Sequence, residues 1–155
     1  MMKKYLLSLI ALSIIVLAVM SSDSFAQRGN KGQGKNIGWN TGSQYNRLYD
    51  KTTVETISGE VTAVETFIPS KGMSGGIHVI LKNEKETISI HLGPSWYLDK
   101  KEIKIAVGDK ISIKGSRITF EGKPTIIASL VSKGDDVLKL RDDNGYPLWS
   151  GSKRK

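Results

Sequence analysis

The chain has 155 residues, 16 glycines, no cysteine and a formal net charge of +8 at neutral pH. This length predicts one domain with short extensions, and the lack of cysteine excludes disulfides, thiolate nucleophiles and thiolate metal ligands. The sequence has neither a Gly-x-Ser-x-Gly motif nor a phosphate-binding loop, so its residues do not indicate an enzyme.

The first 26 residues have the pattern of an export signal. Lys3 and Lys4 precede an apolar run over residues 6–20, and the small residues Ser24 and Ala26 fit cleavage after Ala26. The run is shorter than the roughly 20 residues that a membrane-spanning helix needs. We therefore expect residues 1–26 to be a cleaved signal peptide and the protein to be periplasmic or secreted, with no transmembrane segment after cleavage.

Residues 27–48 are rich in Gly, Asn, Gln and Lys and have few aliphatic side chains. Such a composition buries too little apolar surface to offset the entropy of ordering, so we predict a flexible basic tail. Residues 152–155 form a second basic tail. The chain between residues 50 and 152 has 14 acidic and 14 basic residues, so the excess positive charge belongs to the tails.

Residues 49–151 carry the pattern of a small β domain. Residues 52–68 alternate with a bend at Gly59, and residues 77–81 and 88–92 form a predicted hairpin. Gly93-Pro94 ends that hairpin before a short helix over 95–101. A turn at 108–109 leads into a strand over 110–120 with a second bend at Gly115, and residues 117–120 and 124–131 form a second predicted hairpin. A closing segment runs over 137–151. The sequence thus predicts an all-β, five-stranded OB-type Greek-key barrel with one short helix between strands 3 and 4.

Several residues are assigned structural roles in this barrel. Glycine, proline and aspartate favour turns and bends, and an Arg141–Asp142 ion pair is predicted to fix the C-terminal segment to the barrel. The predicted structural residues are Gly59, Gly93, Pro94, Gly108, Asp109, Gly115, Arg141 and Asp142. A metal-dependent hydrolase built on the acidic residues around 135–143 is a third functional hypothesis, but such a run is usually a solvated surface.

The two histidines of the chain, His78 and His91, are the candidate metal ligands. If Asn83-Glu84 forms the hairpin turn, His78 faces Ser89 and His91 lies one diagonal step away on the same face. The pair can then share a metal ion or flank a non-covalent haem. The alternative is two half-buried histidines hydrogen-bonded to neighbouring strands, and this interpretation is favoured because metal sites usually have further ligands.

Aromatic and basic residues make a candidate ligand surface, because OB folds bind single strands or sugars by stacking on aromatic rings. Its members are Trp39, Tyr45, Trp96, Tyr97, Arg117 and Trp149. The alternative is that these rings pack: Trp39 and Tyr45 dock on the barrel, Trp96 and Tyr97 close its lower end, and Trp149 seals the tail. The neutral barrel lacks the basic groove expected for a nucleic-acid site.

The segments HLGPSWYLD, GDKISIKGSRITFEGKPTIIASLVSKGD and LRDDNGYPLWSG carry a family resemblance. They resemble secreted bacterial OB-fold proteins, some labelled DNA-binding proteins, and the related domains of magnetosome proteins of the MamS/MamX type. Small periplasmic OB-fold stress proteins are more distantly similar. The resemblance implies a binding role in iron handling or redox work. The Cys-x-x-Cys-His haem attachment motif of some relatives is missing here, so the resemblance does not imply a covalently bound haem in this protein.

Besides the hydrolase hypothesis above, these observations lead to two main functional hypotheses. The first is an exported, non-catalytic binding module that works in envelope metal or redox traffic with a protein partner, with metal or non-covalent haem as its cofactor. The second is nucleic-acid or polyanion binding through the basic tails, aided by Trp39 and Tyr45; such binding should weaken steeply with salt.

Overall fold

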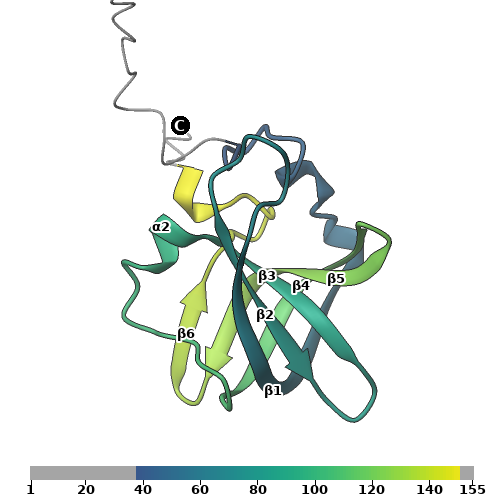
Figure 1. Cartoon of the computed structure of the whole chain (residues 1–155), viewed down its shortest axis with the longest axis vertical. Coiled ribbons are helices and arrows are strands. Elements are labelled where there is room, and N and C mark those ends of the chain that lie inside the picture. Colours follow the sequence, from purple (N-terminus) through teal and green to yellow (C-terminus); the bar gives the residue numbers. More distant parts are fainter. Residues whose placement is uncertain (1–37, 151–155) are drawn as a thin grey trace, which may run out of the picture. The chain divides into compact units, whose positions relative to one another are not determined.

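A computed structural model describes residues 38–150 of the chain (Figure 1). The predicted signal peptide, residues 27–37 of the predicted tail and residues 151–155 lie outside the described part. In chain order the elements are η2 (Asn46–Leu48), η3 (Lys51–Thr53), β1 (Val54–Phe67), β2 (Gly76–Lys82), β3 (Thr87–Pro94), α2 (Ser95–Leu98), β4 (Lys110–Phe120), β5 (Lys123–Lys133), β6 (Asp136–Lys139) and η4 (Leu148–Ser150). Within residues 38–150, no helix has the length and apolar character needed to cross a membrane.

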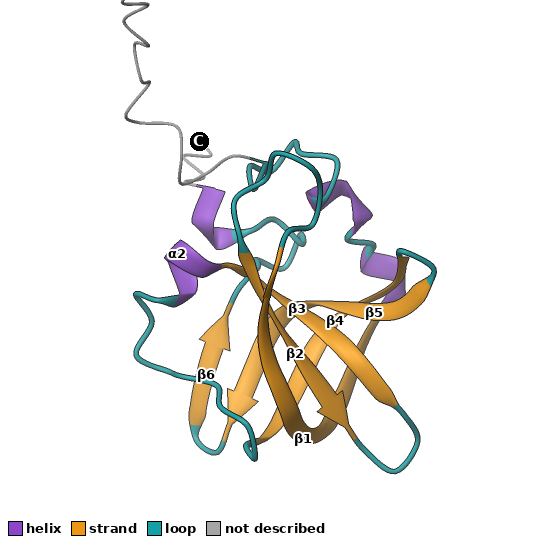
Figure 2. Cartoon of the chain, in the orientation of Figure 1, coloured by secondary structure: helices purple, strands orange, loops and turns teal. Residues whose placement is uncertain are grey.

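The strands form one sheet that closes on itself. Their order is β3-β2-β1-β4-β5-β6, and β3 also pairs with β5 in parallel, which closes the first five strands into a ring (Figure 2). All other neighbouring strands are antiparallel. The ring confirms the predicted OB-type barrel, with the one short helix between β3 and β4. A sixth strand, β6, extends the sheet beyond β5.

The bends of the barrel lie at two predicted glycines. β1 pairs with β4 through its first half and with β2 through its second half, and Gly59 lies at the changeover. A Cβ on Gly59 would lie 2.6 Å from the Lys82 carbonyl oxygen. At Gly115 a Cβ would collide with the Ile127 carbonyl oxygen, beside a register shift between β4 and β5. Only glycine allows these backbones to approach so closely, and β4 therefore continues through Gly115 as one strand.

The other predicted turns occupy their expected places, with one difference in length. Gly93 and Pro94 end β3, and α2 follows but stops at Leu98 instead of residue 101. Gly108 has a φ of +91° in the turn before β4. There the Asp109 Oδ2 accepts a hydrogen bond from the Ala106 N–H at 2.8 Å, which fixes the turn.

The core fills the ring and extends to the segment over residues 38–48, which packs on the barrel. Its buried aliphatic side chains come from every strand of the ring and include Val61, Val79, Ile90, Ile113 and Ile126. The segment over residues 38–48 also packs on the barrel, since Trp39 and Tyr45 are 1% and 3% exposed. The structure thus differs from the predicted boundary at residue 48. Large aromatic side chains bury enough area to hold a polar segment in place.

Candidate functional site

The β2–β3 hairpin brings the two histidines directly opposite each other. His78 pairs with His91 across the strands, not with Ser89 as predicted, so the register differs from the prediction by two residues. The cause is the loop, because Asn83 Oδ1 accepts hydrogen bonds from the Lys85 and Glu86 N–H groups, each at 2.9 Å. This makes a four-residue connection where the prediction had a two-residue turn. From His78 to Lys82, a shift of two residues keeps each side chain on its predicted face, and the register shifts again between Ile77 and His78.

His78 lies at the rim of this face with both ring nitrogens in contact with protein. Its Nε2 is 2.9 Å from Glu65 Oε2 on β1, and its Nδ1 is 3.0 Å from Ser89 Oγ on β3. The ring stacks on Phe67 with centroids 5.1 Å apart. The His78 side chain is 18% exposed and that of Glu65 is 57% exposed, so this contact lies at the surface of the protein.

His91 is buried under aromatic rings. Its ring centroid lies 4.2 Å from that of Phe67 and 4.9 Å from that of Phe120, and its Nδ1 is 2.9 Å from the Tyr45 hydroxyl. Burial, with a smaller contribution from His78, lowers the His91 pKa to about 3. Burial also raises the pKa of Tyr45. The pair is therefore a neutral imidazole beside a protonated phenol at neutral pH.

The histidines border a groove of about 810 Å³, here called the histidine groove. It runs over β2 and β3 between the β1–β2 loop and the β4–β5 turn, which is the surface where OB folds bind their ligands. It is lined by aromatic, aliphatic and acidic residues: Glu65, Phe67, Ile68, His78, Ile80, Glu86, Thr87, Ile88, Ser89, His91, Phe120, Glu121, Lys123, Pro124 and Thr125. The lining has three carboxylates and one lysine, so it favours cations over anions.

Arg117 lies beside the groove and is held by two carboxylates. Its Nε and Nη2 donate to Glu55 at 2.9 and 2.6 Å, and its Nη1 donates to Glu86 at 3.0 Å. The hydrogen bonds that Arg117 donates lower the Glu86 pKa, and the acceptance of these bonds by Glu86 and Glu55 raises the Arg117 pKa. The guanidinium predicted as part of a ligand surface is thus neutralised within the protein.

The predicted aromatic surface divides into a buried part and a half-buried part. Trp39, Tyr45 and Trp149 are buried, which matches the docking alternative. Trp96 and Tyr97 on α2 are half-buried, and Lys101 lies over the Tyr97 ring at 4.1 Å. Tyr97 also contacts Trp149 with centroids 5.6 Å apart. These rings therefore do not form one exposed stacking platform.

The predicted ion pair between Arg141 and Asp142 is not formed, which corrects that prediction. Arg141 donates to the Gly145 carbonyl at 3.0 Å and to Asn46 Oδ1 at 2.8 Å. Asp142 Oδ1 instead accepts the N–H groups of Asn144 and Tyr146, each at 2.9 Å. A carboxylate that caps its own turn by these short-range bonds is a common arrangement for aspartate. Both residues still fix the C-terminal segment, by separate contacts.

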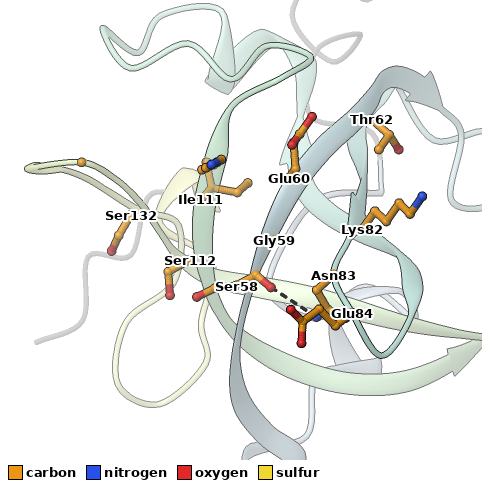
Figure 3. A pocket seen from close by; sticks show the side chains of 12 residues that line it. Ser58, Gly59, Glu60, Thr62, Lys82, Asn83, Glu84, Ile111, Ser112 and Ser132 are labelled. Atoms are coloured by element: carbon orange, nitrogen blue, oxygen red, sulfur yellow. Dashed lines mark hydrogen bonds between the residues drawn. The ribbon is translucent and has the colours of Figure 1, made fainter.

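A second, larger hollow of about 1070 Å³ opens at the bend of β1 (Figure 3). Gly59 lies at its centre, and Asn83 closes one side through a hydrogen bond from Nδ2 to the Ser58 carbonyl at 3.2 Å. The charged residues around it are of both signs: Glu60, Lys82, Glu84 and Lys110. Its lining has no histidine and no aromatic ring, so the histidine groove is the better candidate.

Sequence reasoning identified the histidines and missed their neighbours. Glu65, Phe67 and Phe120 reach the groove from β1 and β4, and the pairing of Glu65 with His78 follows from the β1–β2 register. Only a correct prediction of the β1–β2 register would have placed the Glu65 carboxylate beside His78. Among residues 38–150, no three His, Cys, Asp or Glu side chains are arranged as a preformed metal site.

The order of the strands in the ring defines an OB-type barrel. Residues 53–138 match the MamS/MamX magnetosome protein family, and the chain belongs to this family. The match runs from the start of β1 into β6 and includes both histidines. A search of curated proteins gave no match.

Proposed function

We propose that this protein is an exported, non-catalytic accessory module that binds a transition-metal ion in the histidine groove, in envelope metal traffic with a protein partner. Membership of the MamS/MamX family supports an accessory role associated with magnetosomes. The observation that carries the metal proposal is the direct pairing of the two histidines across β2 and β3, with the Glu65 carboxylate at the His78 Nε2.

The chemistry of these groups suits a metal such as Zn²⁺, Cu²⁺ or iron. Imidazole and carboxylate are common ligands of these ions, and the histidine rings are 5.9 Å apart between centroids. Neutral imidazole is the form that binds metal, and burial keeps His91 in that form. The Tyr45 hydroxyl at Nδ1 would hold the ring orientation, as partners of ligating histidines usually do.

The site would be incomplete by itself. His78 is hydrogen-bonded to Glu65 and Ser89, so a metal would displace one of these contacts and would complete its coordination with water or with groups of a partner. Incomplete coordination favours exchange of the ion, which is what a traffic role requires. The acidic lining of the groove does not favour polyanions.

The test is metal titration of the full chain by calorimetry with Zn²⁺, Cu²⁺ and Fe²⁺, beside the metal and haem content of protein purified from its envelope. We expect His78→Ala and Glu65→Gln each to weaken binding by about 10- to 100-fold. Glu60→Gln, which removes a carboxylate from the same strand outside the groove, is the matched control and should bind as the parent does. Equal affinity in parent, His78→Ala and Glu65→Gln would refute the proposal.

A further inference from the structure

Arg141 is a buried cation without a carboxylate partner. It is 2% exposed, and within residues 38–150 no acidic side chain lies at ion-pair distance from its guanidinium. The group lies between the rings of Tyr49 and Trp149, at 5.0 and 5.2 Å from their centroids. Its Nε has no hydrogen-bond partner. Buried charges normally have an ionic partner because an unpaired one is costly.

Three lysines surround a hollow of about 240 Å³ that Arg141 also lines, here called the lysine hollow. They are Lys51 on η3, Lys114 on β4 and Lys139 on β6. Leu130 on β5 pairs with Lys114 on one side and with Lys139 on the other, so the two lysines flank it on the same face of the sheet.

The lysine charges are only partly compensated. In the described part of the chain, Lys51 and Lys114 have no carboxylate within ion-pair distance, and Lys139 reaches only Asp143 at 3.8 Å. That aspartate is fully exposed, where ion pairs contribute little. Asp142 and Asp143 also line the hollow, so two carboxylates stand against three lysines and Arg141, and the lining keeps an excess of positive charge.

We propose that the lysine hollow binds a phosphate group, either as inorganic phosphate or as a phosphate monoester. Three lysines from three separate elements line one small hollow, and lysine is a common phosphate ligand. Arg141 distinguishes this cluster from a solvated patch of lysines, because its buried charge forms no ion pair and lines the hollow whatever the lysines do. A bound dianion would supply the missing counter-charge.

The test is calorimetric titration of the full chain with inorganic phosphate and with glycerol 3-phosphate at low ionic strength. The variant is Lys114→Ala/Lys139→Ala, and the matched control is Lys82→Ala/Lys110→Ala, which removes the same charge at the larger hollow of Figure 3. All four lysines are exposed, so the folds should persist. We expect phosphate affinity to fall tenfold or more in the first variant and to change less than twofold in the control.

Two results would overturn the proposal: no phosphate binding by the parent protein, or equal losses in variant and control, which would show attraction by net charge alone. Tighter binding of glycerol 3-phosphate than of phosphate would support the proposal and assign a monoester. Equal affinities would support it and show that the site recognises the phosphate group alone, and tighter binding of inorganic phosphate would assign the free anion. The site shares no residue with the histidine groove, so metal and phosphate binding can fail separately.

Discussion

The histidine groove and the lysine hollow each have a buried nitrogen base, and burial acts on the two bases differently. Burial lowers the His91 pKa to about 3, so the imidazole loses its proton and remains as a neutral ligand. Burial lowers the Arg141 pKa to about 10, so the guanidinium keeps its charge at neutral pH. The ordinary pKa of the side chain thus decides whether burial removes a charge or leaves one uncompensated.

The surroundings of the two bases follow from this difference. His91 has aromatic rings and a phenol as neighbours, and its groove is lined by acids that favour a cation. Arg141 has two aromatic faces and two amide or carbonyl oxygens, which stabilise its cation, and the three lysines beside it outnumber the two aspartates of the hollow. One small barrel therefore offers two surfaces of opposite preference, although its charges between residues 50 and 152 balance.

Trp39 connects the two regions, and its removal should have the largest effect. Its ring contacts Tyr45, the partner of His91, and Trp149, which covers Arg141, with centroids 5.1 and 5.9 Å apart. Its backbone oxygen accepts a hydrogen bond from Trp149 Nε1 at 2.9 Å. We expect Trp39→Ala to lower the free energy of unfolding by about 3–5 kcal/mol, measured by urea denaturation.

The control for that variant is Trp96→Ala, which removes a half-buried indole and should cost clearly less. If Trp39→Ala lost less than about 1 kcal/mol, the packing of residues 38–48 on the barrel would be refuted, since full burial of an aromatic side chain contributes several times that.

Lowering the pH should destabilise the folded protein through the burial of His91. The unfolded chain protonates His91 with an ordinary pKa of 6.5, whereas the folded protein does so only near 3. Between these values the unfolded state binds more protons, so stability should fall as pH falls, by at most about 1.4 kcal/mol per pH unit. Urea denaturation from pH 7 to pH 4 measures this slope.

His91→Gln should remove the slope between pH 6.5 and pH 4, because glutamine does not titrate. Protonation of carboxylates with lowered pKa values, such as Glu86 and Asp109, also lowers the stability of the folded protein as pH falls. They are present in both proteins and cancel in the difference. Parallel pH profiles for parent and variant would show that His91 is protonated without cost in the folded state.

Arg117 should have the smallest effect. Its guanidinium is about one-third exposed and joins Glu55 to Glu86, so Arg117→Ala should change stability by less than about 1 kcal/mol. Loss of the cation leaves Glu86 unpaired at the edge of the histidine groove, and metal affinity should rise slightly. A fall in metal affinity, measured by the same calorimetry, would show that Arg117 supports the groove in another way. Glu55→Gln is the control for the loss of one ion pair outside the groove.

The sequence by itself determined the strands, their faces and the bends. Alternation at every second residue fixes which side chains enter the core, as at Ile88, Ile90 and Leu92, because the strand geometry is local. Gly59 and Gly115 were identifiable as bends because no other residue allows such close backbone approach. The short helix after Pro94 followed from the same local rules, although its end did not.

Only the tertiary structure decided which residues meet. A hairpin register shifted by two residues preserves the alternation, so the pattern could not show that His78 lies opposite His91; the Asn83 loop decided it. Composition likewise could not show that Trp39 and Tyr45 are buried. The Arg141 contact with Asn46 joins residues 95 positions apart, and the β3–β5 pairing also closes over a long stretch of chain. Such contacts depend on the closed barrel, which no local stretch of sequence encodes.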